Sequence, residues 1–380
     1  IERTKLGNTF KTILRTAAYA MLIALPFAGI AAPDDRIPVQ IGDRRELFVD
    51  DLLVERLTDV RWRLHAPVPG ETVLKTNERP WEGAGTGYCT VIKDGGVYRL
   101  YYRGAGGLTD GMYCYAESAD GRNWIKPELG LHEFAGSTRN NIILKGPDGT
   151  HSFSPFLDAN PRAAPDERYK AIGLRRTPDN KRWTLLALAS PDGVRWRLLR
   201  GEPVMTEGAF DSQNVAFWSV AENRYVCYFR TKTNGHTGQR QVSRATSDDF
   251  IQWSQGEAMR YRRQGQPAPF EQMYINQTQP YFRAPHLYIA TAARFMQGRR
   301  AVQGAEAEAW PKANFADCSD AVLMTTRGGN DYERTFSEAW IRPGIGAGNW
   351  VTRSNYPVCG LVPTGPDEMS AYVVREYALP

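Results

Sequence analysis

Ser118-Ala-Asp120-Gly121-Arg-Asn-Trp124 is the first copy of a phrase that returns down the chain. The later copies are Ser190-Pro-Asp192-Gly193-Val-Arg-Trp196, Ser247-Asp-Asp249-Phe-Ile-Gln-Trp253 and the degenerate Thr326-Arg-Gly328-Gly329-Asn-Asp-Tyr332. Each copy follows a run of alternating apolar residues and ends in an aromatic residue, which predicts a strand, a tight turn and the next strand. A supersecondary unit that returns every 55 to 80 residues is typical of propellers and other repeat architectures.

A second repeat runs in phase with the first. Tyr98-Arg-Leu-Tyr101-Tyr102-Arg103 matches Tyr225-Val-Cys-Tyr228-Phe229-Arg230, and weaker relatives begin at Tyr169, Leu287 and Met369. Together they give five candidate middle strands. The sequence therefore predicts an all-β fold, a five-bladed β-propeller of four-stranded antiparallel blades. Two stacked β-domains that share the same hairpin chemistry are the alternative.

Composition agrees with short strands and excludes several kinds of site. The 380 residues include 10 Trp, 18 Tyr, 15 Phe, 35 Gly and 24 Pro. The net charge is +5, but the basic and acidic residues are interspersed, so no nucleic-acid partner is expected. The excess suits an anionic sugar or a carboxylated ligand, with a solvated surface as the alternative. Five cysteines without a CxxC pair indicate neither a zinc site nor a disulfide scaffold. We expect no metal or cofactor and leave a structural calcium ion open.

The chain begins with a segment typical of export. Residues 1–32 combine a basic start, an apolar run and small residues at the end, which predicts a signal peptide and a secreted or periplasmic protein. An uncleaved anchor is the alternative; after cleavage we expect no stable membrane insertion. Residues 33–43 read as a linker and 44–380 as one propeller domain, a monomer or a simple homo-oligomer. The fifth blade begins near Asn355, and we expect a strand at Leu47–Val54 or Val60–His65 to close the ring with it.

Carboxylates before the innermost strands are the candidate catalytic groups. In a propeller these strands begin around a central funnel, where loops from different blades converge. Glu82, Asp211 and Glu271 each precede such a strand and stand beside an aromatic residue, whose apolar surface raises a carboxyl pKa. Asp211 is favoured by its polar loop. Asp50 belongs to an adjacent acidic pair, of which at most one member faces a funnel. For each acid, the alternative is a carboxylate that caps a turn.

Eight further residues are candidates for substrate binding: Trp81, His151, Gln213, Asn214, Trp218, Tyr274, Arg283 and His286. The three large aromatics offer either a platform for sugar rings or core packing. His151, Arg283 and His286 have no equivalents in the repeat, and unique residues in a repeat protein are better functional candidates than shared ones. Arg103 and Arg230 end equivalent middle strands, which favours a structural role for both.

The chain resembles the five-bladed propeller glycoside hydrolases of families 32 and 43, closest to secreted bacterial members similar to the family 32 N-terminal domain. The resemblance covers about residues 44–377. The phrases that carry it are Leu47-Phe-Val-Asp50-Asp51, Tyr115-Ala-Glu-Ser-Ala-Asp-Gly-Arg-Asn-Trp124, Gly208-Ala-Phe-Asp211-Ser-Gln-Asn214 and Gln279-Pro-Tyr-Phe-Arg-Ala-Pro-His286. The repeated turn phrase also resembles the sialidase Asp-box, although glycine directly follows the aspartate in the first two copies.

That resemblance implies an acid in the first blade, an aspartate in the second and a glutamate in the third. Glu82 and Asp211 occupy comparable positions with the two residue types exchanged, and the families' Trp-Met-Asn-Asp-Pro, Arg-Asp-Pro and Glu-Cys-Pro phrases do not occur. The leading hypothesis is a secreted glycoside hydrolase that cleaves a carbohydrate substrate with Asp211 and Glu82 as the main pair and Glu271 as a third acid. A non-catalytic carbohydrate-binding propeller is one alternative. A sialidase-like enzyme, favoured by an arginine triad, or a phosphorylase-like one, favoured by a phosphate-binding cluster, is another.

Overall fold

The computed structural model describes residues 38–83, 87–107, 109–235, 237–300, 303–305, 316–345, 347–350 and 355–375. The chain divides into two compact units, Ile1–Gln40 and Ile41–Pro380. Only residues 38–40 of the first unit are described, and they carry no secondary structure. The expected signal segment 1–32 thus lies outside the described residues. No helix in the described part is long and apolar enough to cross a membrane.

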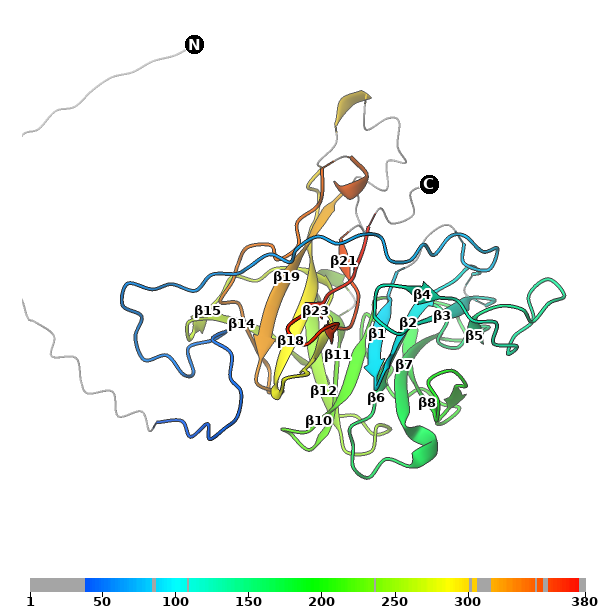
Figure 1. Cartoon of the computed structure of the whole chain (residues 1–380), viewed down its shortest axis with the longest axis horizontal. Coiled ribbons are helices and arrows are strands. Elements are labelled where there is room, and N and C mark those ends of the chain that lie inside the picture. Colours follow the sequence, from blue (N-terminus) through cyan, green and yellow to red (C-terminus); the bar gives the residue numbers. More distant parts are fainter. Residues whose placement is uncertain are drawn as a thin grey trace, which may run out of the picture. The chain divides into compact units, whose positions relative to one another are not determined.

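Three antiparallel sheets follow one another along the chain, each with its strands in sequence order (Figure 1). The first contains β1 (Thr90–Asp94), β2 (Val97–Arg103), β3 (Met112–Ser118) and β4 (Trp124–Ile125), with β5 (Ile142–Lys145) added beside β3. The second contains β6 (Phe153–Leu157), β7 (Tyr169–Arg176), β8 (Trp183–Ser190) and β9 (Arg197–Leu198). The third contains β10 (Val215–Ser219), β11 (Arg224–Asn234), β12 (Thr237–Ser247) and β13 (Glu257–Ala258). Four-stranded antiparallel sheets were predicted; the second and third sheets confirm this, and the first has the same four strands with β5 added.

The fourth sheet is larger and its first strand is broken. Residues 276–277 separate β16 (Met273–Ile275) from β17 (Thr278–Tyr281), and both parts pair with β18 (Ala284–Met296). The sheet continues through β19 (Cys318–Thr326) and β20 (Asp331–Glu333) to β14 (Arg260–Arg263) and β15 (Gln266–Pro267). Two short pairs end the described chain. They join β21 (Tyr356–Pro357) to β24 (Val373–Val374) and β22 (Val362–Pro363) to β23 (Met369–Ser370).

The predicted N-terminal strand is wrong, because no strand forms at 47–54, at 60–65 or elsewhere in 41–83 (blue in Figure 1). The apolar alternation that suggested it is interrupted by Asp50, whose Oδ1 accepts a hydrogen bond from the backbone N–H of Leu52 (3.2 Å) and bends the chain. Leu47 and Val49 still bury their side chains against the fourth sheet, around Tyr281 and Leu287. The segment therefore contributes apolar packing without pairing its backbone.

The first strands of successive sheets contact one another: β1 contacts β6, β6 contacts β10, β10 contacts β17, and β1 contacts β22. The contact between β1 and β22 brings the first sheet of the second unit beside its C-terminal strands. Val91 donates its backbone N–H to the carbonyl of Cys359 (2.6 Å), and Cys359 donates its own to the carbonyl of Cys89 (3.0 Å). Residues about 270 positions apart thereby lie side by side in parallel.

The repeated phrase folds in the same way in its three clear copies. The Ser118, Ser190 and Ser247 hydroxyl oxygens each accept the backbone N–H three residues later, at 2.9 Å every time. In each copy the aspartate accepts two further backbone N–H groups, and the Trp indole donates to the carbonyl three residues before it. The third copy has Phe250 at φ +68°, where the other two have glycine. Phe250 is fully buried, and its packing offsets a conformation unfavourable for a bulky residue.

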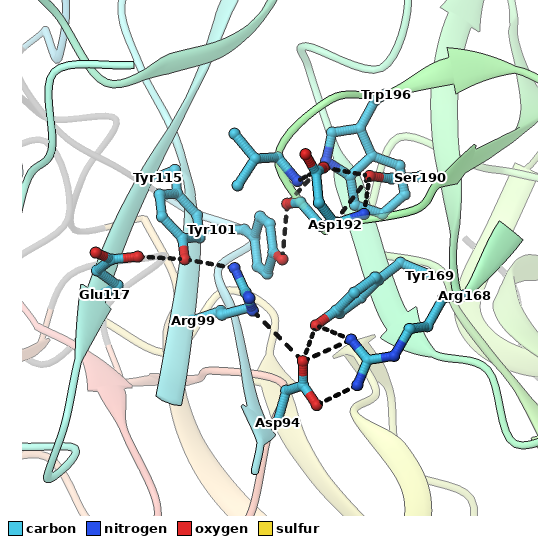
Figure 2. A network of polar contacts seen from close by, with 12 residues as sticks. Asp94, Arg99, Tyr101, Tyr115, Glu117, Arg168, Tyr169, Ser190, Asp192 and Trp196 are labelled. Atoms are coloured by element: carbon cyan, nitrogen blue, oxygen red, sulfur yellow. Dashed lines mark hydrogen bonds and ion pairs between the residues drawn. The ribbon is translucent and has the colours of Figure 1, made fainter. Parts of the chain in front are cut away.

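These turns also join neighbouring sheets. The Tyr101 hydroxyl of the first sheet donates to the Gly193 carbonyl of the second (2.9 Å), and Tyr372 donates in the same way to Gly121 (2.6 Å). Figure 2 shows the first of these junctions beside a second link. There the Arg168 guanidinium grips both carboxylate oxygens of Asp94, at 2.5 and 2.7 Å. The hydrogen bonds from Arg168 are the main reason that the pKa of Asp94 is lowered.

The core is dominated by large aromatic side chains, including nine fully buried tyrosines among the described residues. The Tyr228 hydroxyl is buried without a hydrogen-bond partner among those residues, whereas the other eight hydroxyls have one. The five cysteines are all buried, and no two of them form a disulfide. No group of His, Cys, Asp and Glu suited to a metal ion occurs in the described chain.

Candidate functional site

Residues that stand before or at the first strands of four sheets come together. The His151 imidazole Nε2 and the Asp211 carboxylate Oδ1 are 2.9 Å apart, although His151 precedes β6 and Asp211 precedes β10. The Tyr88 ring, before β1, lies 6.0 Å from the His151 ring, edge to face. Tyr274 of β16 acts electrostatically on Tyr88, as Asp211 does. We call the following residues the Asp211 cluster: Tyr88, Arg103, His151, Asp211, Arg230, Arg240 and Tyr274.

Asp211 is held by a loop whose polar residues satisfy its backbone. The Asn214 carboxamide donates to the carbonyls of Phe210 and Ser212, both at 3.0 Å, and the Ser212 hydroxyl donates to the Tyr274 carbonyl (2.8 Å). Asn214 is therefore buried, and its side chain holds the loop in place rather than facing a ligand. The Asp211 side chain itself is 53% exposed. Its carboxylate is thus available to solvent while the loop beneath it is fixed.

His151 is fixed by an aromatic stack. Its ring lies 4.4 Å from that of Trp183, with an angle of 21° between the planes, and the Arg176 guanidinium covers Trp183 at 4.3 Å. The imidazole cannot rotate without losing this stack, so its Nε2 stays directed at Asp211. A histidine oriented in this way can donate a hydrogen bond to the carboxylate and hold it in place.

Tyr88 adopts a backbone conformation that a tyrosine rarely takes. Its φ is +59°, and the residue is only 8% exposed. Such strain costs of order 1–3 kcal/mol and is concentrated at ligand and active sites. The Tyr113 hydroxyl donates to the Tyr88 carbonyl and helps to hold the conformation. Burial, with the neighbouring Tyr274 and Asp211, raises the pKa of Tyr88 well above its ordinary value, so the phenol is neutral and can act as a hydrogen-bond donor.

Three arginines surround the aromatic rings of the cluster. The Arg103 guanidinium lies 5.7 Å from the Tyr88 ring centre, and Arg230 and Arg240 lie 5.2 and 5.1 Å from that of Tyr274. Burial lowers the pKa of Arg240, and the charge of Arg230 lowers it further. The sequence suggested a structural role for Arg103 and Arg230, because both end equivalent middle strands. It gave no signal for Arg240, which comes close to Arg230 only because β12 pairs with β11.

Glu82 is fully buried and its carboxylate oxygens are occupied. One oxygen accepts the backbone N–H groups of Glu78 and Arg79, at 3.0 and 2.9 Å. The other accepts the Tyr102 hydroxyl (2.6 Å) and lies 2.7 Å from the Lys126 ammonium. This is the arrangement of a turn-capping carboxylate. No hydrogen bond or ion pair joins Glu82 to Asp211.

Glu271 belongs to an ionic network beside the fourth sheet. Its carboxylate pairs with Arg294 and Arg334, and Arg294 also grips Asp320 at 2.7 and 2.9 Å. Burial raises the pKa of Glu271, but the charges of Arg334 and Arg294 outweigh burial and hold it below its ordinary value. A carboxyl with a lowered pKa is a poor proton donor at neutral pH.

Asp50, Arg283 and His286 lie at the opposite end of the fourth sheet from Tyr274. Arg327, which follows β19, pairs with Asp50 (2.6 Å) and with Glu46 (2.8 Å), and His286 contacts Glu46 at 2.9 Å. Arg283 donates to the carbonyl of Pro366 (2.9 Å). The register explains the separation, because Thr326 pairs with Tyr288 at one end of β18 and Met273 pairs with Arg294 near the other. These residues hold the N-terminal segment.

Neither tryptophan predicted as a platform joins the cluster. Trp81 donates its indole N–H to the Asn141 side chain (2.6 Å) and packs edge to face on Phe134. Trp218 is 3% exposed near the far end of β10, where it packs on Tyr225. Both have the core role that was the alternative. Tyr274 alone of the three predicted aromatics lies in the Asp211 cluster.

Gln213, predicted as a binding residue, lies beneath the cluster and links sheets. Its amide nitrogen donates to the Cys89 carbonyl and the Thr90 hydroxyl, both at 3.0 Å. Its oxygen accepts the Gln277 amide (2.6 Å), which also donates to the Pro357 carbonyl (3.2 Å). The side-chain amides of Gln213 and Gln277 therefore link the first strands of these sheets.

Comparisons with known proteins give weak likenesses to glycoside hydrolases. No family model and no curated protein matches the chain. One similar structure comes from work on family 130 of mannoside phosphorylases, a family that contains glycoside hydrolases that target β-1,2-mannosidic linkages in Candida mannan. It is 14% identical over 80% of this chain and 90% of its own, with a TM-score of 0.46. An α-L-arabinofuranosidase from Fusarium graminearum is 13% identical over 79% of this chain and 76% of its own, with a TM-score of 0.42. An α-L-arabinanase from Penicillium chrysogenum is 11% identical over 66% and 65%, with a TM-score of 0.42. At these identities and TM-scores, the likenesses assign neither a family nor an activity to the chain.

Proposed function

We propose that the sheets are the blades of a five-bladed propeller and that the Asp211 cluster is its carbohydrate site, used for the hydrolysis of a glycosidic bond. The contacts of β1 with β6 and β22, of β6 with β10 and of β10 with β17 support the ring. The two short C-terminal pairs supply the fifth blade in this scheme. The main support for the site is the contact between Asp211 and His151, which come from two different sheets and lie 2.9 Å apart. The Asp211 side chain is 53% exposed, so a ligand can reach its carboxylate.

Asp211 is the reacting carboxylate in this proposal. One oxygen of its carboxylate accepts a proton from an attacking water or attacks the anomeric carbon itself. His151 orients the carboxylate through the contact between its Nε2 and Oδ1. The Tyr88 hydroxyl and the Tyr274 ring offer a hydrogen-bond donor and an apolar face to a sugar. Secretion, expected from residues 1–32, would bring the protein to external glycans.

A non-catalytic carbohydrate-binding propeller is the second candidate, and one observation favours it. Most glycoside hydrolases use two carboxyl groups about 5–9.5 Å apart. Glu82 and Glu271 are instead held by Lys126 and by arginines, and no hydrogen bond or ion pair connects either of them to Asp211. A site with one reacting carboxylate can bind sugars without cleaving them.

The test is turnover and binding by the Asp211→Asn variant. The wild-type protein is first screened against plant, algal and host polysaccharides and nitrophenyl glycosides for released sugar, and by calorimetry for binding. Asp367→Asn serves as the control, since Asp367 is exposed. We expect Asp211→Asn to lose at least 100-fold in kcat with an unchanged unfolding midpoint, and Asp367→Asn to match wild type. Binding without any turnover by wild type selects the second candidate, and full activity in Asp211→Asn removes this residue from the reaction.

A further inference from the structure

We propose that the Asp211 cluster recognises an anionic sugar, through a subsite in which Arg230 and Arg240 hold a carboxylate or sulfate group of the glycan. The inference rests on the proposed carbohydrate site and names its substrate class. It depends on two neighbouring cations, the buried Arg230 and the half-buried Arg240, neither of which forms a salt bridge with a carboxylate of the described residues, on their mutual repulsion, and on the aromatic ring that both approach.

Other buried or partly buried arginines have carboxylate partners. Arg244 pairs with Glu222, Arg334 with Glu271, and Arg327 with both Glu46 and Asp50. Arg230 is as buried as Arg244, at 8% against 9% exposed, yet no carboxylate of the described residues lies within salt-bridge distance of it. Arg240 is half-buried and forms no salt bridge with the described residues either, although the charge of Asp317 also acts on it. Arg230 uses its Nε–H on the Ala209 carbonyl (2.9 Å), and Arg240 makes its side-chain hydrogen bond to the neutral Gln272 (3.4 Å).

The two guanidinium groups repel each other. The charge of Arg230 adds to burial in lowering the pKa of Arg240. Taking a cation out of water without a counter-ion is unfavourable, and a second cation beside it increases the cost. An anion bound between the two would remove both penalties. Charge-assisted hydrogen bonds from arginine to carboxylate or sulfate are among the strongest polar contacts that a protein makes.

Both arginines approach the ring of Tyr274, Arg230 at 5.2 Å and Arg240 at 5.1 Å from its centre, and Tyr356 and Phe295 pack beside that ring at 5.2 and 5.6 Å. A charged group alone would not need this apolar surface, whereas a sugar ring stacks on it while its acidic substituent meets the arginines. Asp211 would repel the anion, but its carboxylate contacts His151 on the side of Trp183. The anionic group therefore belongs on the Tyr274 side of the cluster.

Binding to matched pairs of glycans tests the proposal directly. Calorimetry compares oligogalacturonate with its methyl ester, a sialylated oligosaccharide with its desialylated form, and a sulfated oligosaccharide with its desulfated form. Inorganic sulfate alone is the fourth ligand. We expect at least one charged member to bind tenfold or more tightly than its neutral partner, with affinity falling as salt rises. The pair that responds distinguishes carboxylate from sulfate, and binding of inorganic sulfate alone with equal strength would overturn the sugar requirement.

Three variants and two controls locate the effect. Arg240→Gln and Arg230→Gln are expected to abolish the preference for the charged member, and Arg240→Lys to retain part of it. Arg224→Gln, an exposed position at the other end of β11, should behave as wild type. Arg244→Gln, on β12 with Arg240, removes a paired arginine and should lower the unfolding midpoint, while Arg240→Gln should leave it unchanged or raise it.

The outcomes separate this inference from the proposed hydrolysis. Selective binding of a charged glycan that is lost in Arg240→Gln supports the subsite even when no sugar is released. Hydrolysis of neutral glycans with unaltered kcat/KM in Arg240→Gln refutes the subsite and leaves the hydrolase standing. Equal affinity for charged and neutral members throughout the panel, or a fall in the unfolding midpoint of Arg240→Gln equal to that of Arg244→Gln, also overturns it.

Discussion

Gln213 and Gln277 share a hydrogen bond of 2.6 Å between side chains that are 1% and 0% exposed. Through it, the first strands of the first, third and fourth sheets are connected, and Gln277 extends the link to Pro357. The Gln277 Oε1 has no partner among the described residues, although it is buried. Buried polar groups of this kind are usually satisfied by ordered water. The link is polar, and it therefore depends on the geometry of both amides.

Gln277→Leu removes two hydrogen bonds and leaves the Gln213 oxygen unsatisfied. A buried group stripped of its partner costs about 1–3 kcal/mol, so we expect the free energy of unfolding to fall by about that amount. Urea denaturation measures it, with Gln255→Leu at an exposed position as the control. Equal stability of the two variants would mean that the Gln213–Gln277 link contributes nothing.

Tyr101→Phe and Tyr372→Phe should have nearly equal effects. Each hydroxyl donates to the first glycine carbonyl of a repeated turn, Gly193 or Gly121, and a Trp indole donates to the same carbonyl at 3.1 Å. Because the carbonyl keeps one donor, each loss should be small, about 1 kcal/mol. Thermal unfolding of the two single variants checks this. A much larger loss for one of them would show that the two junctions are not equivalent.

Glu271→Gln should lower stability at neutral pH and lose its effect in acid. The folded pKa of Glu271 is depressed by Arg334 and Arg294 despite burial. A depressed folded pKa stabilises the protein above the unfolded pKa, and that stability is lost as the pH falls through the folded value. Unfolding midpoints of wild type and variant should therefore converge below about pH 4. Parallel curves from pH 7 to pH 3 would contradict the ion-pair assignment. Turnover, once found, should survive in the variant.

Glu82→Gln should destabilise the protein more than it affects any activity. The carboxylate satisfies two backbone N–H groups and the Lys126 ammonium at full burial, and breaking such a pair typically costs about 3–5 kcal/mol. Glu78→Gln is the matched control, because Glu78 meets the same lysine at 3.2 Å from an exposed position. A stable Glu82→Gln protein that has lost turnover would return Glu82 to the catalytic scheme.

The repeated turn and the repeated middle strand were readable from sequence because their residues interact locally. Ser190, Asp192 and Trp196 bind backbone groups within three positions, so their chemistry is contained in the phrase itself. The antiparallel sheets follow directly from such hairpins. The prediction of an N-terminal strand was wrong because a strand also needs a distant partner strand, which an alternating sequence does not supply. Asp50 instead accepts a hydrogen bond from the backbone of Leu52 and bends the chain.

The site was only partly predictable, because its members meet through long-range packing. Asp211 was predicted from its position before a first strand, His151 from its uniqueness in the repeat and Tyr274 as an aromatic platform, and the structure brings the three together. Glu82 stands at an equivalent sequence position, but Lys126 and Tyr102 surround it, and no local pattern announces them. Arg240 was missed because its significance arises from Arg230 on the adjacent strand.

The five buried thiols make the chain a reporter on its own unfolding. Cys114, Cys227 and Cys318 lie on strands of three different sheets, and Cys359 lies between β21 and β22. Since no disulfide forms among them, the fold does not depend on an oxidant, and an alkylating reagent can modify a given cysteine only when its own sheet opens. Pulsed alkylation followed by peptide mass analysis would consequently reveal the order in which the sheets separate.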